Sequence, residues 1–212
     1  MKKGAIFDMD GLLFDTEKVY KRAWIETAEI FGKDNGAELA SKVSGGSDKY
    51  CRQMIHELYP EIDIEKFFKH VVDSAQSVFA NGVDLMIGVE EILQLFKDNG
   101  VKIAVASSSP AWLVEQNLKK TNIRNYFDAI IGGDNIKNGK PAPDIFLKAA
   151  EAINLPPEEC YVFEDSFNGI RGAFKAGCAP IMIPDTNQPN DEIKKLCTGI
   201  YASLSDAAKA IR

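Results

Sequence analysis

The segment GAIFDMDG, residues 4–11, decides the fold class of this chain. Its apolar half, Gly4 to Phe7, runs directly into a polar turn that carries two acids, Asp8 and Asp10. A short apolar run that ends in such a turn is typical of a buried strand in a parallel sheet, which presents the residues after it at its carboxyl end. We therefore predict a strand at residues 4–7 with two carboxylates at its tip.

The same pattern returns in the second half of the chain, where apolar runs that predict strands alternate with amphipathic runs that predict helices. The strands are expected at residues 101–106, 129–131, 161–163 and 180–183, and the helices at residues 89–98, 112–120, 144–153, 168–176 and 203–211. This alternation predicts an α/β fold in which helices cover both faces of a parallel sheet.

The stretch between these parts is helical in pattern and contains no convincing strand. An apolar stripe along residues 16–31 includes Trp24 and Ile30, and Asp15 is a suitable cap for the helix that this stripe predicts. We therefore predict two domains. The core consists of residues 1–14 and 82–212, and an α-helical insertion consists of residues 15–81.

Composition and charge exclude several classes of protein. The 212 residues are 45% hydrophobic, which is enough for a sizeable core, and the net charge of −6 disfavours binding to nucleic acid. No apolar run reaches membrane-spanning length, and the four cysteines are widely spaced. We expect a cytoplasmic monomer with reduced thiols, no nucleic-acid partner and no membrane partner.

The residues that follow the expected strands form one chemical set. Ligands of open parallel sheets bind beyond the carboxyl ends of the strands. The polar residues at these ends are Asp8, Asp10, Ser107, Glu164 and Asp165, and Lys140 lies in the loop that follows the third expected strand. Each one alone could be a helix cap, a turn residue or a surface charge, but together they are improbable as independent caps.

This set suits phosphoryl transfer. Clustered carboxylates repel one another unless a divalent cation lies among them, and a shell of oxygen ligands suits Mg²⁺. A carboxylate nucleophile can approach a phosphate dianion only with charge compensation, which Mg²⁺ and Lys140 would supply. The expected partner is therefore a small-molecule phosphate ester.

Four blocks of the sequence resemble the haloacid dehalogenase-like phosphatases and phosphomutases. They are Phe7 to Leu13 (FDMDGLL), Val105 to Ser107 (VAS), Gly139 to Asp144 (GKPAPD) and Val162 to Ile170 (VFEDSFNGI). The blocks occur in the family's order. The resemblance implies a Rossmann-like core and an inserted helical cap that closes over the site and selects the substrate.

The resemblance also implies a role for each residue of the set. Asp8 would be the nucleophile, and Asp10 the general acid and base. Ser107, Ser108 and Lys140 would bind the phosphate. The predicted metal residues are Asp8, Asp10, Glu164 and Asp165, with Asp10 acting through its backbone carbonyl and Glu164 in support.

Within the family, the chain is most similar to the β-phosphoglucomutase-like subgroup and to pseudouridine-5'-phosphatase. The predicted function is a Mg²⁺-dependent phosphatase of a sugar phosphate or a nucleotide-like monophosphate. β-Phosphoglucomutase is the alternative, although this chain has Tyr20 and Asp48 where the mutases have a His and an Arg. A non-catalytic sugar-phosphate sensor is a distant third. The residues expected to set substrate specificity are Tyr20, Gly45, Lys49 and Arg52.

Overall fold

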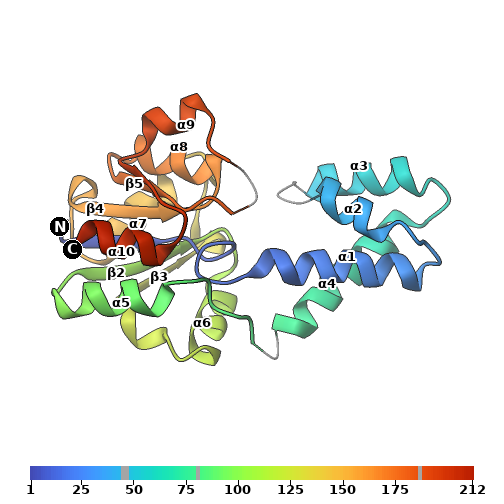
Figure 1. Cartoon of the computed structure of the whole chain (residues 1–212), viewed down its shortest axis with the longest axis horizontal. Helices are drawn as coiled ribbons and strands as arrows, with labels where there is room; N and C mark the ends of the chain where they lie inside the picture. Colours follow the sequence, from blue (N-terminus) through green and yellow to red (C-terminus); the bar gives the residue numbers. More distant parts are fainter. Residues whose placement is uncertain (44–47, 80–81, 186–187) are drawn as a thin grey trace. The chain divides into compact units, whose positions relative to one another are not determined.

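A computed structural model describes residues 1–43, 48–79, 82–185 and 188–212, without the side chains of Asp48, Lys49 and Asn135. These residues form two compact units (Figure 1). One unit comprises residues 1–14 and 84–212, and the other comprises residues 15–83. The predicted insertion ended at residue 81, and its role as a cap stays a prediction.

The first unit is built on a six-stranded parallel sheet with the strand order β3-β2-β1-β4-β5-β6 (Figure 1). The strands are β1 (Gly4–Phe7), β2 (Lys102–Ser107), β3 (Ala129–Gly132), β4 (Cys160–Glu164), β5 (Ala179–Met182) and β6 (Gly199–Ile200). The helices are α5 (Val89–Asp98), α6 (Ala111–Lys120), α7 (Asp144–Ala152), α8 (Phe167–Lys175), α9 (Asp191–Leu196) and α10 (Leu204–Ile211). Three short 3₁₀ helices complete the unit: η1 (Arg124–Tyr126), η2 (Gly133–Asn135) and η3 (Pro157–Glu159).

The two faces of the sheet have different cores, because successive side chains of a strand point to opposite faces. Ile6 packs with α7 residues such as Phe146. Phe7 stacks on Phe163 of β4, with 4.6 Å between the ring centroids, and contacts Phe96 of α5. Each fully buried side chain of this size stabilises the fold by roughly 1.5–3 kcal/mol. Both faces are covered, so the predicted α/β class is confirmed.

The second unit is helical throughout its described residues. Its helices are α1 (Thr16–Ile30), α2 (Gly36–Val43), α3 (Asp48–Leu58) and α4 (Ile64–Phe79). Asp15 caps α1 by accepting a hydrogen bond from the backbone N–H of Lys18. Trp24, on the predicted apolar stripe, is buried near Phe67, whereas Ile30, at the end of that stripe, is 65% exposed. The helix ends at Ile30, and Thr27 and Ala28 of its last turn are buried.

The chain leaves the first unit and returns to it at neighbouring points. Phe14 forms an isolated antiparallel bridge with Leu85, and the Met86 N–H donates to the Leu13 carbonyl at 3.0 Å. The segments before and after the helical unit are therefore joined to each other by backbone hydrogen bonding.

The four cysteines are free thiols. Burial raises the pKa of Cys160 to about 11 and that of Cys178 to about 12, so both thiols stay protonated at neutral pH. Buried protonated thiols of this kind act as small apolar side chains. In the described ranges no helix is both long enough and apolar enough to cross a bilayer.

Candidate active site

The strand register brings three strand tips together. Phe7 of β1 is paired with Val105 of β2 on one side and with Phe163 of β4 on the other. The ladder continues one residue further, because the Asp8 N–H donates to the Phe163 carbonyl at 3.0 Å. The residues that follow these three positions therefore lie at one edge of the sheet.

Lys140 lies between two of the acids at this edge. Its ammonium donates to Asp8 Oδ1 and, at 2.5 Å, to Glu164 Oε1. The side chains of Lys140 and Asp8 are each 9% exposed, and that of Glu164 is fully buried. Burial opposes the charge of the ammonium, but Asp8 and Glu164 together raise the pKa of Lys140 above its usual value. Lys140 is therefore a permanent cation in the site.

Glu164 is fixed by the start of α8. Ser166 donates to Glu164 Oε2 through its N–H at 3.1 Å and through its hydroxyl at 2.8 Å. Gly169 makes room for the carboxylate, because a Cβ at this position would lie 1.8 Å from Glu164 Cδ. The backbone around Glu164 thus holds the carboxylate that orients Lys140 toward Asp8.

Asp10 faces the end of β2. Its Oδ2 accepts hydrogen bonds from the hydroxyls of Ser109 at 3.0 Å and Ser107 at 3.4 Å. Burial raises the pKa of Asp10, and the hydrogen bonds from Ser109 and Ser107 partly offset this effect. Ser108, predicted to bind phosphate, is exposed, and its role stays a prediction.

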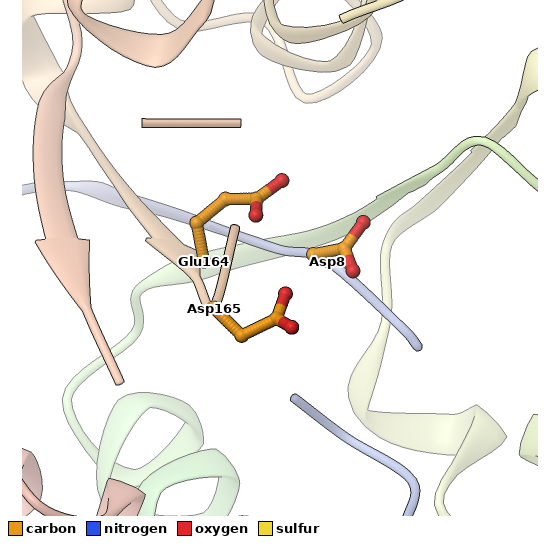
Figure 2. Close-up of side chains that lie close together, drawn as sticks. All are labelled: Asp8, Glu164 and Asp165. Atoms are coloured by element: carbon orange, nitrogen blue, oxygen red, sulfur yellow. The ribbon is translucent and has the colours of Figure 1, made fainter. Parts of the chain in front are cut away.

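Asp8, Glu164 and Asp165 form a group that can hold a metal ion. One carboxylate oxygen from each lies within 4.8 Å of the other two, and Figure 2 shows the three side chains gathered at the ends of their strands. Burial and the neighbouring acids raise the pKa of Asp8 to about 7 and that of Asp165 to about 9. A donor set of crowded oxygens is the type that Mg²⁺ prefers, so these residues fit the expected ion.

Two residues of this edge were not predicted. One is Ser109, and the other is Asp185, three residues beyond the end of β5. Gly11 has a φ of 76°, and a Cβ there would lie 2.6 Å from Asp165 Oδ2 and 3.6 Å from Asp185 Oδ2. Applying the strand-tip rule to the expected strand at residues 180–183 would have found Asp185.

The predicted specificity residues belong to the helical unit. Tyr20 is 39% exposed and packs edge-on against Phe79, with 5.6 Å between the ring centroids. The Arg52 guanidinium pairs with Glu65 at 2.9 Å and lies 3.9 Å from the centroid of the Phe68 ring. Gly45 lies outside the described residues, and so does the side chain of Lys49. The specificity roles of all four stay predictions.

The raised pKa values predict how stability depends on pH when a chelator removes divalent cations. Between pH 6 and 8, folded Asp165 keeps a proton that the unfolded chain has lost, and Asp8 keeps its proton over part of this range. Because the folded state binds more protons, its free energy of unfolding should fall as pH rises. The slope is at most about 1.4 kcal/mol per pH unit for each group.

Chemical denaturation in EDTA at pH 6, 7 and 8 measures this effect. Asp165→Asn should make the loss of stability smaller. Asp191→Asn, which changes a carboxyl that is 94% exposed, should leave the loss unchanged. A free energy of unfolding that rises over this range in the wild type would contradict the assignment.

The fold and this edge of the sheet define an α/β protein in which acidic residues at the strand tips lie around a buried lysine. The model of the haloacid dehalogenase-like hydrolases matches residues 5–183. The chain belongs to this family, which confirms the resemblance seen in the sequence.

Similar proteins narrow the class of enzyme. A phosphorylated carbohydrates phosphatase from Thermotoga maritima is 36% identical over 176 residues, which cover 82% of each chain. A probable pseudouridine-5'-phosphatase from Drosophila melanogaster is 34% identical over 95% of this chain and 89% of its own. A Thermotoga maritima crystal structure described provisionally as a β-phosphoglucomutase is 29% identical with a TM-score of 0.85, covering 99% of this chain and 98% of its own. This chain is thus a phosphoric monoester hydrolase.

Proposed function

We propose that this chain is a Mg²⁺-dependent phosphatase of small phosphorylated carbohydrates or nucleoside-like monophosphates, and that it acts through an aspartyl-phosphate on Asp8. The observation that carries this proposal is the buried contact of Lys140 with Asp8 beside Asp165. A carboxylate, a fixed cation and a further carboxylate lie at one strand edge, and this arrangement supports phosphoryl transfer to a carboxylate.

The first half of the reaction transfers the phosphoryl group to the enzyme. A carboxylate oxygen of Asp8 attacks phosphorus, the bond from phosphorus to the ester oxygen breaks, and Asp10 gives its proton to that oxygen. Lys140 neutralises charge on Asp8 as a phosphate dianion approaches. Mg²⁺, held by Asp8 and Asp165, would add positive charge beside the phosphoryl oxygens.

The second half restores the enzyme. Asp10, now ionised, takes a proton from a water molecule as the oxygen of that water attacks phosphorus. The bond between phosphorus and Asp8 breaks, and inorganic phosphate leaves. Asp10 is again protonated and Asp8 is again a carboxylate. The Ser107 hydroxyl, at the end of β2, stays on Asp10 in both halves, so the Lys140 ammonium is the donor to phosphoryl oxygens.

The names of the relatives support the substrate class. The Thermotoga maritima relative acts on phosphorylated carbohydrates, and a 31% identical Escherichia coli relative is a fructose-1-phosphate phosphatase. The Drosophila melanogaster relative is named for pseudouridine 5'-phosphate. All three names describe a phosphate ester of a small hydroxylated ring or chain, and this chemical class is the one we assign to this chain.

A β-phosphoglucomutase activity is the second candidate, because the solved structure with a TM-score of 0.85 carries that provisional description. A mutase must hold a second phosphate while the first is transferred. Tyr20 and Asp48 stand where the mutases have a His and an Arg, and neither supplies a cation for this purpose. The phosphatase is therefore the better supported function.

A panel of esters with Mg²⁺ tests the proposal. It contains fructose 1-phosphate, sugar 6-phosphates, pseudouridine 5'-phosphate, and β-glucose 1-phosphate with its bisphosphate activator. We expect release of inorganic phosphate from at least one ester, with no isomerised sugar phosphate. Isomerisation without net phosphate release would show mutase activity. Release of phosphate from none of these esters would contradict the proposed substrate class.

A further inference from the structure

Ser109 is a polar residue at the site that the proposed cycle does not use. It follows β2 by two residues, and its hydroxyl donates to Asp10 Oδ2 at 3.0 Å. Its own N–H donates to the Ser107 hydroxyl at 3.0 Å, and that hydroxyl lies 3.4 Å from the same Asp10 oxygen. Ser107, Ser109 and Asp10 thus form a closed ring of hydrogen bonds.

This ring distinguishes the two oxygens of Asp10. Both serine hydroxyls lie within hydrogen-bond distance of Oδ2. Ser107 Oγ accepts from the Ser109 N–H, which leaves its own hydrogen to point toward Asp10. An oxygen that accepts two hydroxyl donors is a poor carrier of the proton that must leave. The transferable proton of Asp10 therefore belongs on Oδ1.

The backbone after Ser109 is tied to the end of β3. The Gly133 N–H donates to the Ser109 carbonyl at 3.0 Å, and the Ala111 N–H donates to Asp134 Oδ1 at 3.0 Å. Gly133 permits this close approach, because a Cβ there would lie 2.2 Å from the Ser108 carbonyl oxygen. The turn is thus held at Ser109 and just after it, which fixes the backbone that carries the Ser109 hydroxyl.

We propose that Ser109 is a positioning residue for Asp10: it fixes Oδ2 so that Oδ1 presents the proton to the departing ester oxygen. This inference rests on the proposed function, in which Asp10 is the acid. Ser109 contributes most where the leaving group needs that proton. A general acid typically accelerates a reaction by roughly 10²–10⁴-fold. Displacing it by a fraction of a hydrogen-bond length removes much of this rate acceleration.

The choice of leaving group separates positioning from a merely structural role. An alkoxide from a sugar phosphate leaves only with a proton, whereas p-nitrophenolate leaves without one. kcat/KM reports the steps through loss of the leaving group, so the second half of the reaction does not affect the comparison. Ser109→Ala should lower kcat/KM for fructose 1-phosphate, or for the best ester of the panel, by about 10- to 100-fold. For p-nitrophenyl phosphate the loss should stay below about 3-fold.

Two further variants complete the test. Ser109→Thr keeps the hydroxyl and should restore most of the activity on the sugar ester. Ser205→Ala is a matched control, because it removes a hydroxyl that donates to the Glu91 carboxylate at 2.6 Å, away from Asp10 in the chain. This variant should leave kcat/KM unchanged for both substrates.

The outcomes distinguish this inference from the proposed function. Equal losses on both substrates in Ser109→Ala, or no loss on the sugar ester, would overturn the positioning role while the wild type remains an active phosphatase. A wild type that releases phosphate from neither ester would instead remove the proposed function.

Discussion

Replacing Asp8 with asparagine is expected to abolish phosphate release, with kcat lower by at least about 10³-fold. An amide oxygen is a far weaker nucleophile than a carboxylate, and the residual rate of an enzyme that has lost its nucleophile comes from binding and charge stabilisation alone. Asp8 is also the acid that contacts Lys140 at the strand edge, so the change removes one negative charge from that contact.

Folding should survive this replacement. The asparagine side chain has nearly the shape of the native aspartate, and Lys140 keeps its partner Glu164 at 2.5 Å. Circular dichroism and the thermal midpoint test this expectation, and Asp191→Asn, at an exposed carboxyl on α9, is the matched control for losing one negative charge. Trapping phosphorylated wild-type enzyme by acid quenching, with none in the variant, would place the phosphoryl group on Asp8. Turnover by the folded variant near the wild-type rate would refute the covalent route.

Removal of divalent cations should have the next largest effect. Excess EDTA is expected to lower kcat/KM by at least about 100-fold, because the ion then no longer supplies positive charge to the phosphate dianion, and without it Asp8 keeps its proton over part of the neutral range and is a poorer nucleophile. Adding Mg²⁺ in excess of the chelator should restore activity fully. Activity that persists after exhaustive chelation would contradict a role for the ion.

A binding measurement that is independent of turnover would also test whether Mg²⁺ binds at the acid cluster. An ion that binds only the folded state stabilises it by about 2.7 kcal/mol at 100 times its Kd. Mg²⁺ should therefore raise the thermal midpoint of the wild type and should do so much less in Asp165→Asn. A similar rise in both proteins would show that the ion binds away from Asp165.

The sheet could be predicted because parallel strands obey strong rules. The runs that became β1, β2 and β4 are almost wholly apolar, and parallel strands end at the same edge, so Asp8 and Glu164 had to converge. α9 and β6 were not predicted, because six and two residues are too few to show a hydrophobic period. Core elements were predictable, whereas short peripheral ones were not.

The directions of side chains at the strand tips and in the loops could not be predicted from the sequence. Three serines in a row follow Ala106, and only the structure shows that Ser107 and Ser109 face Asp10 while Ser108 is exposed. The expected strand ended at Ala106, one residue before β2 does, so Ser107 was expected just beyond the strand and not as its last residue. Lys140 was expected in the set because it lies in the loop after the third expected strand, but no periodicity describes such a loop, so its contacts with Asp8 and Glu164 could not be predicted.

The bridge between Phe14 and Leu85 bears on how enzymes of this design diversify. The segments before and after residues 15–83 are already hydrogen-bonded to each other within the sheet unit. Residues 15–83 are therefore an insertion at a single point of that unit. A different helical module could be grafted there, with the hydrolytic machinery left intact. The prediction that the helical unit selects the substrate implies that exchanging this unit would change substrate preference while the acids at the strand tips stay the same.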